Sequence, residues 1–148
     1  MGFASGSVIE NAGAKMFYDA GDLSLIGYNS SYGPGIELNS LIIPDNYVVE
    51  GNTFTKNITL KYVFMASGVT LYNCCFSECP SLVSVKLSNT LEKIPDDAFD
   101  KCSSLARITI PDNVTSIGSG AFIGCALKKI ALSRNISNIG ETAFLNCP

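Results

Sequence analysis

Six cysteines are the residues of this 148-residue chain with the widest range of chemistry. Thiols can pair as disulfides, bind zinc or react with oxidants. Four of them recur at nearly equal spacing: Cys79, Cys102, Cys125 and Cys147. The sequence contains no histidine, so the commonest metal ligand and the usual general acid–base residue are both missing. The even spacing of the cysteines is therefore the main evidence on which of these thiol reactions the chain could use.

The cysteine spacing belongs to a repeat of 22 or 23 residues that is copied five times. The five units are residues 38–59, 60–81, 82–104, 105–126 and 127–148, and each begins with a leucine. A fixed period of this length predicts a solenoid, because each unit can bury its apolar side only against its neighbours. Residues 1–37 do not follow the repeat. They are expected to form an irregular N-terminal cap over the first unit, or an anchor to another protein.

Each unit starts with the pattern of a strand that has one buried face. Apolar residues stand at its first, fourth and sixth positions, as in Leu105, Ile108 and Ile110, and more variable residues separate the last two. Later in each unit comes Ala-Phe-x-x-Cys or a variant of it, for example at 98–102. A Phe and a Cys three residues apart suit a single helical or 3₁₀ turn with both side chains directed inward.

Repeated in phase, Leu-x-x-Ile-x-Ile-Pro followed by Ile-Gly-x-x-Ala-Phe-x-x-Cys resembles the BspA-like type of leucine-rich repeat, found in surface proteins of bacteria and protists. The resemblance covers about three quarters of the chain, and the first unit departs from it with Asn57 in place of the cysteine. It implies a leucine-rich-repeat solenoid with a parallel β-sheet on its concave side. Turns and short helical segments would lie on the convex side. It also implies adhesion, protein binding and an extracellular or cell-surface location, although no signal peptide is visible.

The phase of the repeat places the four evenly spaced cysteines in one ladder inside the solenoid. Stacked strands lie about 4.8 Å apart, whereas disulfide-bonded cysteines need their Cβ atoms about 3.8 Å apart. A ladder of four thiols also extends too far for zinc, which gathers its ligands around one point. We therefore expect buried free thiols at these positions and at Cys75. Cys74 is the candidate exposed thiol, either an incidental surface group or a redox site.

The strand residues that point away from the core form the candidate ligand-binding surface on the concave face. They include five of the ten basic residues and none of the thirteen acidic ones. The selected candidates are Ile42, Tyr62, Phe64, Lys86, Arg107, Thr109 and Lys129. Aromatic side chains beside arginine are frequent in hot spots, so this surface predicts a protein partner that is acidic and partly apolar, with a glycan less favoured. The alternative interpretation is that strand lysines only keep an exposed sheet soluble.

No motif in the sequence indicates catalysis, a cofactor or a metal site. The glycines within 118–124 have the wrong spacing for a dinucleotide-binding loop and fall on a turn of the repeat. Asp96 and Asp97 are adjacent, so turn geometry explains them better than a catalytic pair of carboxylates. A net charge of −3 gives no general attraction to nucleic acid. No apolar run reaches the roughly 18 residues that cross a membrane, so membrane insertion is not expected.

The sequence thus predicts a non-enzymatic module for protein binding or adhesion. The alternative is a structural spacer, or an assembly subunit of a surface appendage or virion, that acts through its ends. This alternative draws on the last repeat, which stops at Cys147-Pro148 with nothing to cover it. Because terminal repeats of solenoids normally carry a polar cap, we expect the final unit to pack against another chain as an oligomer, or to continue in a longer array.

Overall fold

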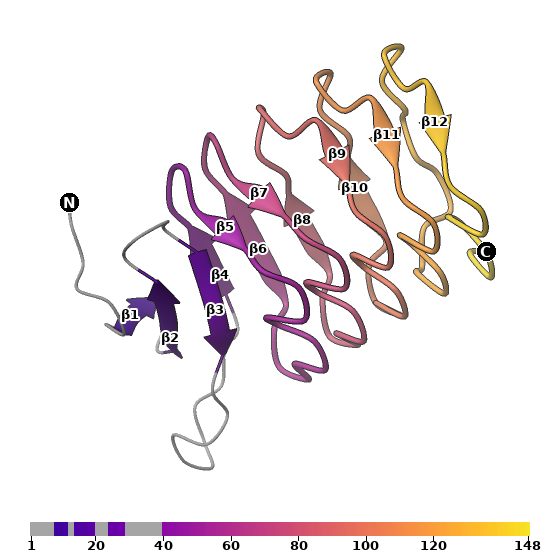
Figure 1. The fold of residues 1–148 in the computed structure, drawn as a ribbon. Coiled ribbons are helices and arrows are strands. Elements are labelled where there is room, and N and C mark those ends of the chain that lie inside the picture. The colour runs from indigo at the N-terminus through magenta and orange to yellow at the C-terminus, as the bar shows by residue number, and fades with distance from the viewer. Residues whose placement is uncertain (1–7, 12–13, 20–23, 29–39) are drawn as a thin grey trace.

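The computed structural model describes residues 8–11, 14–19, 24–28 and 40–148, so Leu38 of the first predicted unit lies outside the described residues. Stacked coils of the chain form a solenoid (Figure 1), and the described residues contain twelve strands and no helix. The strands are β1 (Val8–Asn11), β2 (Ala14–Asp19), β3 (Ser24–Tyr28), β4 (Ser40–Ile43), β5 (Val48–Val49), β6 (Tyr62–Met65), β7 (Thr70–Leu71), β8 (Ser84–Lys86), β9 (Lys93–Ile94), β10 (Arg107–Thr109), β11 (Ser116–Ile117) and β12 (Asn138–Ile139). Within these ranges no helix could span a membrane. The predicted parallel-strand solenoid is confirmed.

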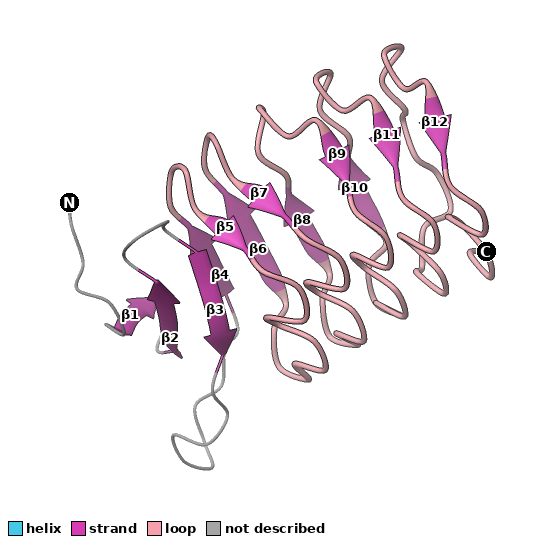
Figure 2. Cartoon of the chain, viewed as in Figure 1, coloured by secondary structure: helices cyan, strands magenta, loops and turns pink. Residues whose placement is uncertain are grey.

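The longer strands β4, β6, β8 and β10 form a parallel sheet along one side of the solenoid (Figure 2), in the order β10-β8-β6-β4. Successive strands pair at equivalent positions of the repeat, so Val63 of β6 stands beside Leu41 of β4 and Val85 of β8. These three side chains are buried, whereas Tyr62 and Phe64 are exposed. The alternating pattern of the sequence therefore predicted the correct buried face.

The opposite side of the core, which we call the short-strand side, carries the two-residue strands β5, β7, β9, β11 and β12 (Figure 2). Strands β3, β5 and β7 pair in parallel, and β9, β11 and β12 form a second parallel sheet. Strands β2 and β1 extend the first of these sheets in antiparallel pairing. The short-strand side thus begins with strands from residues 1–37. Their role as a cap or an anchor, and the boundary at residue 38, stay predictions.

The Ala-Phe-x-x-Cys segments form tight turns with i to i+3 hydrogen bonds, such as the bond from the Cys102 N–H to the Phe99 carbonyl at 3.2 Å. The predicted single turn is present, but no described segment continues as a helix. Each segment carries two residues, four positions apart, whose φ angles lie between 52° and 65°. These pairs are Asn52 and Lys56, Cys74 and Glu78, Asp97 and Lys101, Gly120 and Gly124, and Thr142 and Asn146. A left-handed residue interrupts a right-handed helix. The backbone also bonds between units, as where the N–H of Phe76 donates to the carbonyl of Ala98 at 3.0 Å.

The phenylalanines of these turns form a continuous stack through the core. The ring centroids of Phe54 and Phe76 lie 5.1 Å apart, and the two ring planes differ by 8°. Phe99, Phe122 and Phe144 extend the stack at spacings of 5.7, 5.5 and 5.5 Å. Each of the first four rings is at most 1% exposed. The predicted inward orientation of the phenylalanines is therefore confirmed.

The last unit departs from the predicted pattern. Residues 127–132 form no strand, and the long-strand sheet ends at β10. The link from Cys125 to Leu127 is one residue shorter than the equivalent link from Cys102 to Leu105. We attribute the loss of pairing to this shorter link, because a change of one residue in register exchanges the two faces of a strand. Leu132, expected in the core, is 44% exposed.

Candidate functional site

The outward side chains of the long-strand sheet form two straight rows. One row consists of Ser40, Tyr62, Ser84 and Arg107, and the other of Ile42, Phe64, Lys86 and Thr109. We call these eight side chains the sheet face. Parallel strands pair in register, so neighbours within a row come from equivalent positions of adjacent units. The sheet face contains six of the seven predicted ligand-binding residues.

One end of the sheet face is apolar. Ile42, Tyr62 and Phe64 are 54%, 52% and 43% exposed, respectively. The ammonium nitrogen of Lys86 lies 4.6 Å from the centroid of the Phe64 ring, which is the geometry of a cation–π contact. The apolar and basic parts of the surface therefore touch. Neighbouring exposed apolar side chains of this size form a contact surface that single scattered ones do not.

Two hollows border the basic end of the sheet face. Lys86 and Thr109 help to line the first, which has a volume of about 430 Å³. Arg107, Lys128 and Lys129 help to line the second, of about 490 Å³, where the last unit diverges from β10. Lys129 was predicted to lie on a strand of the sheet, and this prediction is wrong. Lys129 nevertheless lies at the same hollow as Arg107.

The cations of this surface have no acidic partner among the residues that the structure describes. Within residues 40–148, the one ion pair joins the Lys101 Nζ to the Asp100 Oδ2 at 3.5 Å, and neither residue belongs to the sheet face. Lys86, Arg107 and Lys129 thus have no carboxylate within ion-pair distance in the described part of the chain. Uncompensated cations attract the acidic groups of an approaching partner.

Cys74, the predicted exposed thiol, is half-buried in a turn. Burial first, and then the negative charges of Asp97, Asp100 and Asp96, raise the pKa of its thiol above the ordinary value of 9.0. A higher pKa leaves less of the thiolate, which is the reactive form. This environment favours an incidental surface thiol over a redox site. The described residues also contain no group of three or more histidine, cysteine, aspartate or glutamate side chains placed to hold a metal ion.

A second candidate surface lies on the short-strand side, where pairing is interrupted between β7 and β9. In unit two, the N–H of Tyr72 donates to the Val49 carbonyl at 2.9 Å and so ties it to unit one. In unit four, the N–H of Gly118 donates to the Ile94 carbonyl at 2.8 Å in the same way. The equivalent residue of unit three is Pro95, which has no N–H to donate. Unit three is also one residue longer than its neighbours, and together these two features explain the interruption.

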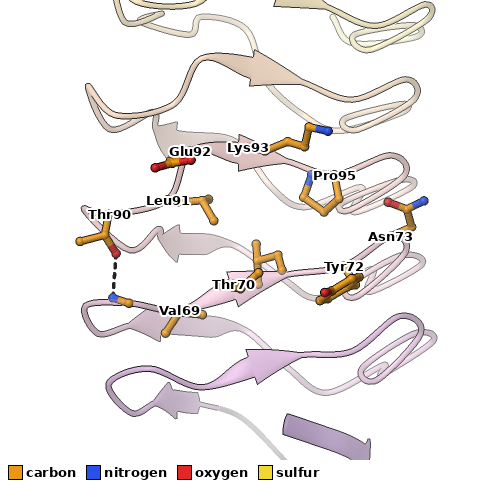
Figure 3. Close-up of a pocket in the computed structure, with 11 residues that line it drawn as sticks. Val69, Thr70, Tyr72, Asn73, Thr90, Leu91, Glu92, Lys93 and Pro95 are labelled. Carbon is orange, nitrogen blue, oxygen red and sulfur yellow. Dashed lines mark hydrogen bonds between the residues drawn. The ribbon is translucent and has the colours of Figure 1, made fainter. Parts of the chain in front are cut away.

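The interruption leaves a hollow of about 630 Å³, shown in Figure 3. Thr70 and Tyr72 lie along one edge of it, and Glu92, Lys93 and Pro95 lie along the other. We call it the ladder-gap hollow. None of these residues was predicted as a site from the sequence. The longer third unit and Pro95 were visible signals, but their effect depends on pairing between units.

Comparison with known proteins identifies the family. The family profile described as BspA type leucine rich repeat region matches residues 24–148 in six copies. The chain therefore belongs to the BspA-type leucine-rich-repeat family, as its repeat pattern suggested. The matched region begins at the first residue of β3. No curated protein sequence matches the chain.

Crystal structures of three leucine-rich-repeat proteins have a similar fold. A leucine rich cell surface protein from Faecalibacterium prausnitzii has a TM-score of 0.81 and 30% identity, over 95% of this chain and 37% of that protein. The T. pallidum leucine rich repeat protein has a TM-score of 0.77 and 24% identity, over 95% and 68%. A leucine-rich repeat protein from Bacteroides ovatus has a TM-score of 0.69 and 21% identity, over 93% and 36%. The chain thus spans little more than a third of the first and third of these proteins, and the two with lower identity support the fold alone.

Proposed function

Because the chain is a BspA-type leucine-rich-repeat protein, we propose that it is a protein-binding module that acts at a cell surface. The sheet face holds a partner whose contact surface is acidic and partly apolar. The similar Faecalibacterium prausnitzii protein is described as a cell surface protein, which supports this location. Adhesion is the form of binding that such a location favours.

The observation that carries the proposal is the contact between aromatic and basic side chains on the sheet face. Arg107 stands in the same row as Tyr62, two strands away, and Lys86 lies over Phe64. Tyrosine and arginine are the residue types that dominate binding hot spots. If the lysines only kept the sheet soluble, the exposed apolar group of Ile42, Tyr62 and Phe64 would work against that purpose. A binding surface accounts for both sets of residues.

Interferometry against a panel of purified extracellular-matrix and serum proteins tests this proposal. For a partner that binds, the double variant Arg107→Glu and Lys129→Glu should weaken affinity by about tenfold or more, because it replaces attraction by repulsion. Tyr62→Ala should weaken affinity to a similar extent through lost apolar contact. Arg134→Glu combined with Lys56→Glu is the matched control, since it makes the same charge change at two exposed residues outside the sheet face. Affinity should also fall as salt is added.

Wild-type affinity in the Arg107 and Lys129 variant would contradict the sheet-face proposal. The alternative of a structural spacer predicts that the end of the solenoid matters instead. Ile139 and Leu145 of the last unit are 45% and 49% exposed. If light scattering shows self-association that Ile139→Ser and Leu145→Ser abolish, and no sheet-face variant changes any binding, the spacer is the correct interpretation.

A further inference from the structure

We propose that the ladder-gap hollow is a saccharide-binding site that takes one neutral pyranose residue of a glycan. The hollow lies between β7 and β9 on the short-strand side of the core, away from the sheet face (Figures 2 and 3). Binding there is independent of a protein partner on the sheet face. The proposal therefore adds a second binding activity to the one proposed above.

Hydrogen bonds at both ends hold the hollow in shape. At one end, the N–H of Gly68 donates to the Thr90 Oγ1 at 2.7 Å, as the dashed line in Figure 3 shows. At the other end, the N–H of Cys74 donates to the Asp96 carbonyl at 3.0 Å. Between these two bonds Pro95 cannot tie unit three to unit two. The site is thus formed before a ligand arrives, and this reduces the entropy lost on binding.

Tyr72 supplies an aromatic surface at the edge of the hollow. Its side chain is 51% exposed, and its backbone N–H is fixed by the bond to Val49. The face of an aromatic ring is electron-rich. The axial C–H groups of a pyranose ring carry partial positive charge and pack against such a face. An exposed tyrosine beside polar groups therefore suits a sugar, which has an apolar face and a polar rim.

Polar side chains around Tyr72 match the hydroxyl groups of a sugar. The Thr70 hydroxyl and the Asn73 amide can both donate and accept, the Glu92 carboxylate accepts, and the Lys93 ammonium donates. None of these four side chains has a hydrogen bond or an ion pair with another described residue. They are thus available to a ligand. Because the charges of Glu92 and Lys93 cancel, the hollow favours a neutral sugar over a sulfated or sialylated one.

The size and floor of the hollow fit a small ligand. Its volume of about 630 Å³ lies within the roughly 300–1,000 Å³ of typical ligand sites. Val69, Leu71 and Leu91 line it from below and are 2%, 6% and 4% exposed. These side chains belong to the packed core, so the floor is rigid. A rigid floor under an aromatic edge gives the sugar ring a defined position.

Saturation-transfer NMR with neutral tetrasaccharides of glucose, mannose, galactose and N-acetylglucosamine tests the proposal. At least one of them should bind the wild-type chain with a dissociation constant of about 1 mM or lower. Tyr72→Ala should weaken that binding by about tenfold or more, whereas Tyr72→Phe keeps the ring and should retain it. Asn73→Ala gives a second variant at an exposed position and should also weaken binding. Tyr62→Ala is the matched control, because Tyr62 is equally exposed but lies on the sheet face.

The thermal midpoint of each variant is measured, and binding is compared only among variants whose midpoint equals that of the wild type. A loss of binding then reports a change at the site and not a change in the fold. The proposal is overturned if no tetrasaccharide binds, or if Tyr72→Ala and Asn73→Ala bind as well as the wild type. It is also overturned if Tyr62→Ala weakens binding as much as Tyr72→Ala. Sheet-face variants that lose protein binding should still bind the sugar. The two proposals can therefore fail separately.

Discussion

The thiol of Cys102 donates a hydrogen bond to the carbonyl oxygen of Phe76, with a sulfur–oxygen distance of 3.2 Å. Equivalent bonds of 3.2 Å run from Cys79, Cys125 and Cys147 to the carbonyls of earlier phenylalanines. A thiol is a weak donor and otherwise behaves as a small apolar side chain. The cysteine of the repeat thus fills the core and also satisfies a carbonyl of the neighbouring turn.

Thiol titration should therefore find mostly unreactive cysteines in the native chain. Four of them are at most 1% exposed: Cys75, Cys79, Cys102 and Cys125. Burial also raises the pKa of Cys125 to about 12. We expect modification first at Cys74 and more slowly at Cys147, and all six thiols should titrate in denaturant without reductant. Fewer than six thiols in denaturant would show disulfides and contradict the ladder of free thiols.

Truncation of one ring in the phenylalanine stack should destabilise the whole solenoid. Phe99 is fully buried and stacks on both Phe76 and Phe122. Phe99→Ala should lower the free energy of unfolding by about 3–5 kcal/mol, measured by urea denaturation. Phe64→Ala on the sheet face is the control, and it should cost less than about 1 kcal/mol because the ring is already 43% exposed. Equal losses would mean that the stack is not the centre of the core.

An added side chain at Gly118 and at Gly124 should destabilise the fold for different reasons. A Cβ atom on Gly118 would lie 2.6 Å from the carbonyl carbon of Pro95, so Gly118→Ala must push units three and four apart. Gly124 has a φ of +65°, but the nearest atom to its added Cβ is 3.9 Å away. We expect a loss of stability of about 3 kcal/mol for Gly118→Ala and about 1 kcal/mol for Gly124→Ala. Thermal unfolding of both variants measures the difference, and the reverse order would contradict this packing.

The solenoid could be predicted because the phase of apolar residues is both the clearest pattern in the sequence and the main source of stability. The left-handed turns could not be predicted from residue types. They fall on residues such as Asp97 and Lys101, and only the fourth unit has glycine at both places, Gly120 and Gly124. Hydrogen bonds between units impose this backbone conformation, such as the bond from the Lys101 N–H to the Ile123 carbonyl at 2.7 Å. These bonds exist only after the units stack.

The candidate surfaces also could be predicted only in part from the sequence. The sheet face followed from the alternation of residues along each strand, because burial alternates in the same way. Lys129 was placed on a strand by that rule, but the shorter link between Cys125 and Leu127 removes the strand. The ladder-gap hollow depends on Pro95 standing opposite Leu71 in a different unit. A proline inside one repeat is easily seen, but its effect on pairing requires the register of the neighbouring unit.

Asp97 gives a pH-dependent test of the turn in unit three. Burial first, and then the carboxylates of Asp100 and Asp96, raise the pKa of Asp97 above its ordinary value of 3.8. The folded chain therefore holds this proton more tightly than the unfolded chain does, so stability falls as pH rises through the raised pKa. Above that pH the charged side chain destabilises the folded state.

The variant Asp97→Asn removes this charge and keeps a side chain that tolerates the φ of 52° at this position. We expect it to raise the thermal midpoint relative to the wild type at pH 7. Its advantage should shrink as the pH is lowered through the raised pKa and disappear below 3.8, because Asp97 is then protonated in both the folded and the unfolded state. Asp112→Asn removes the same charge at an exposed turn residue and serves as the control. A thermal midpoint at pH 7 that is unchanged or lower in Asp97→Asn would show that neighbouring carboxylates do not strain this turn.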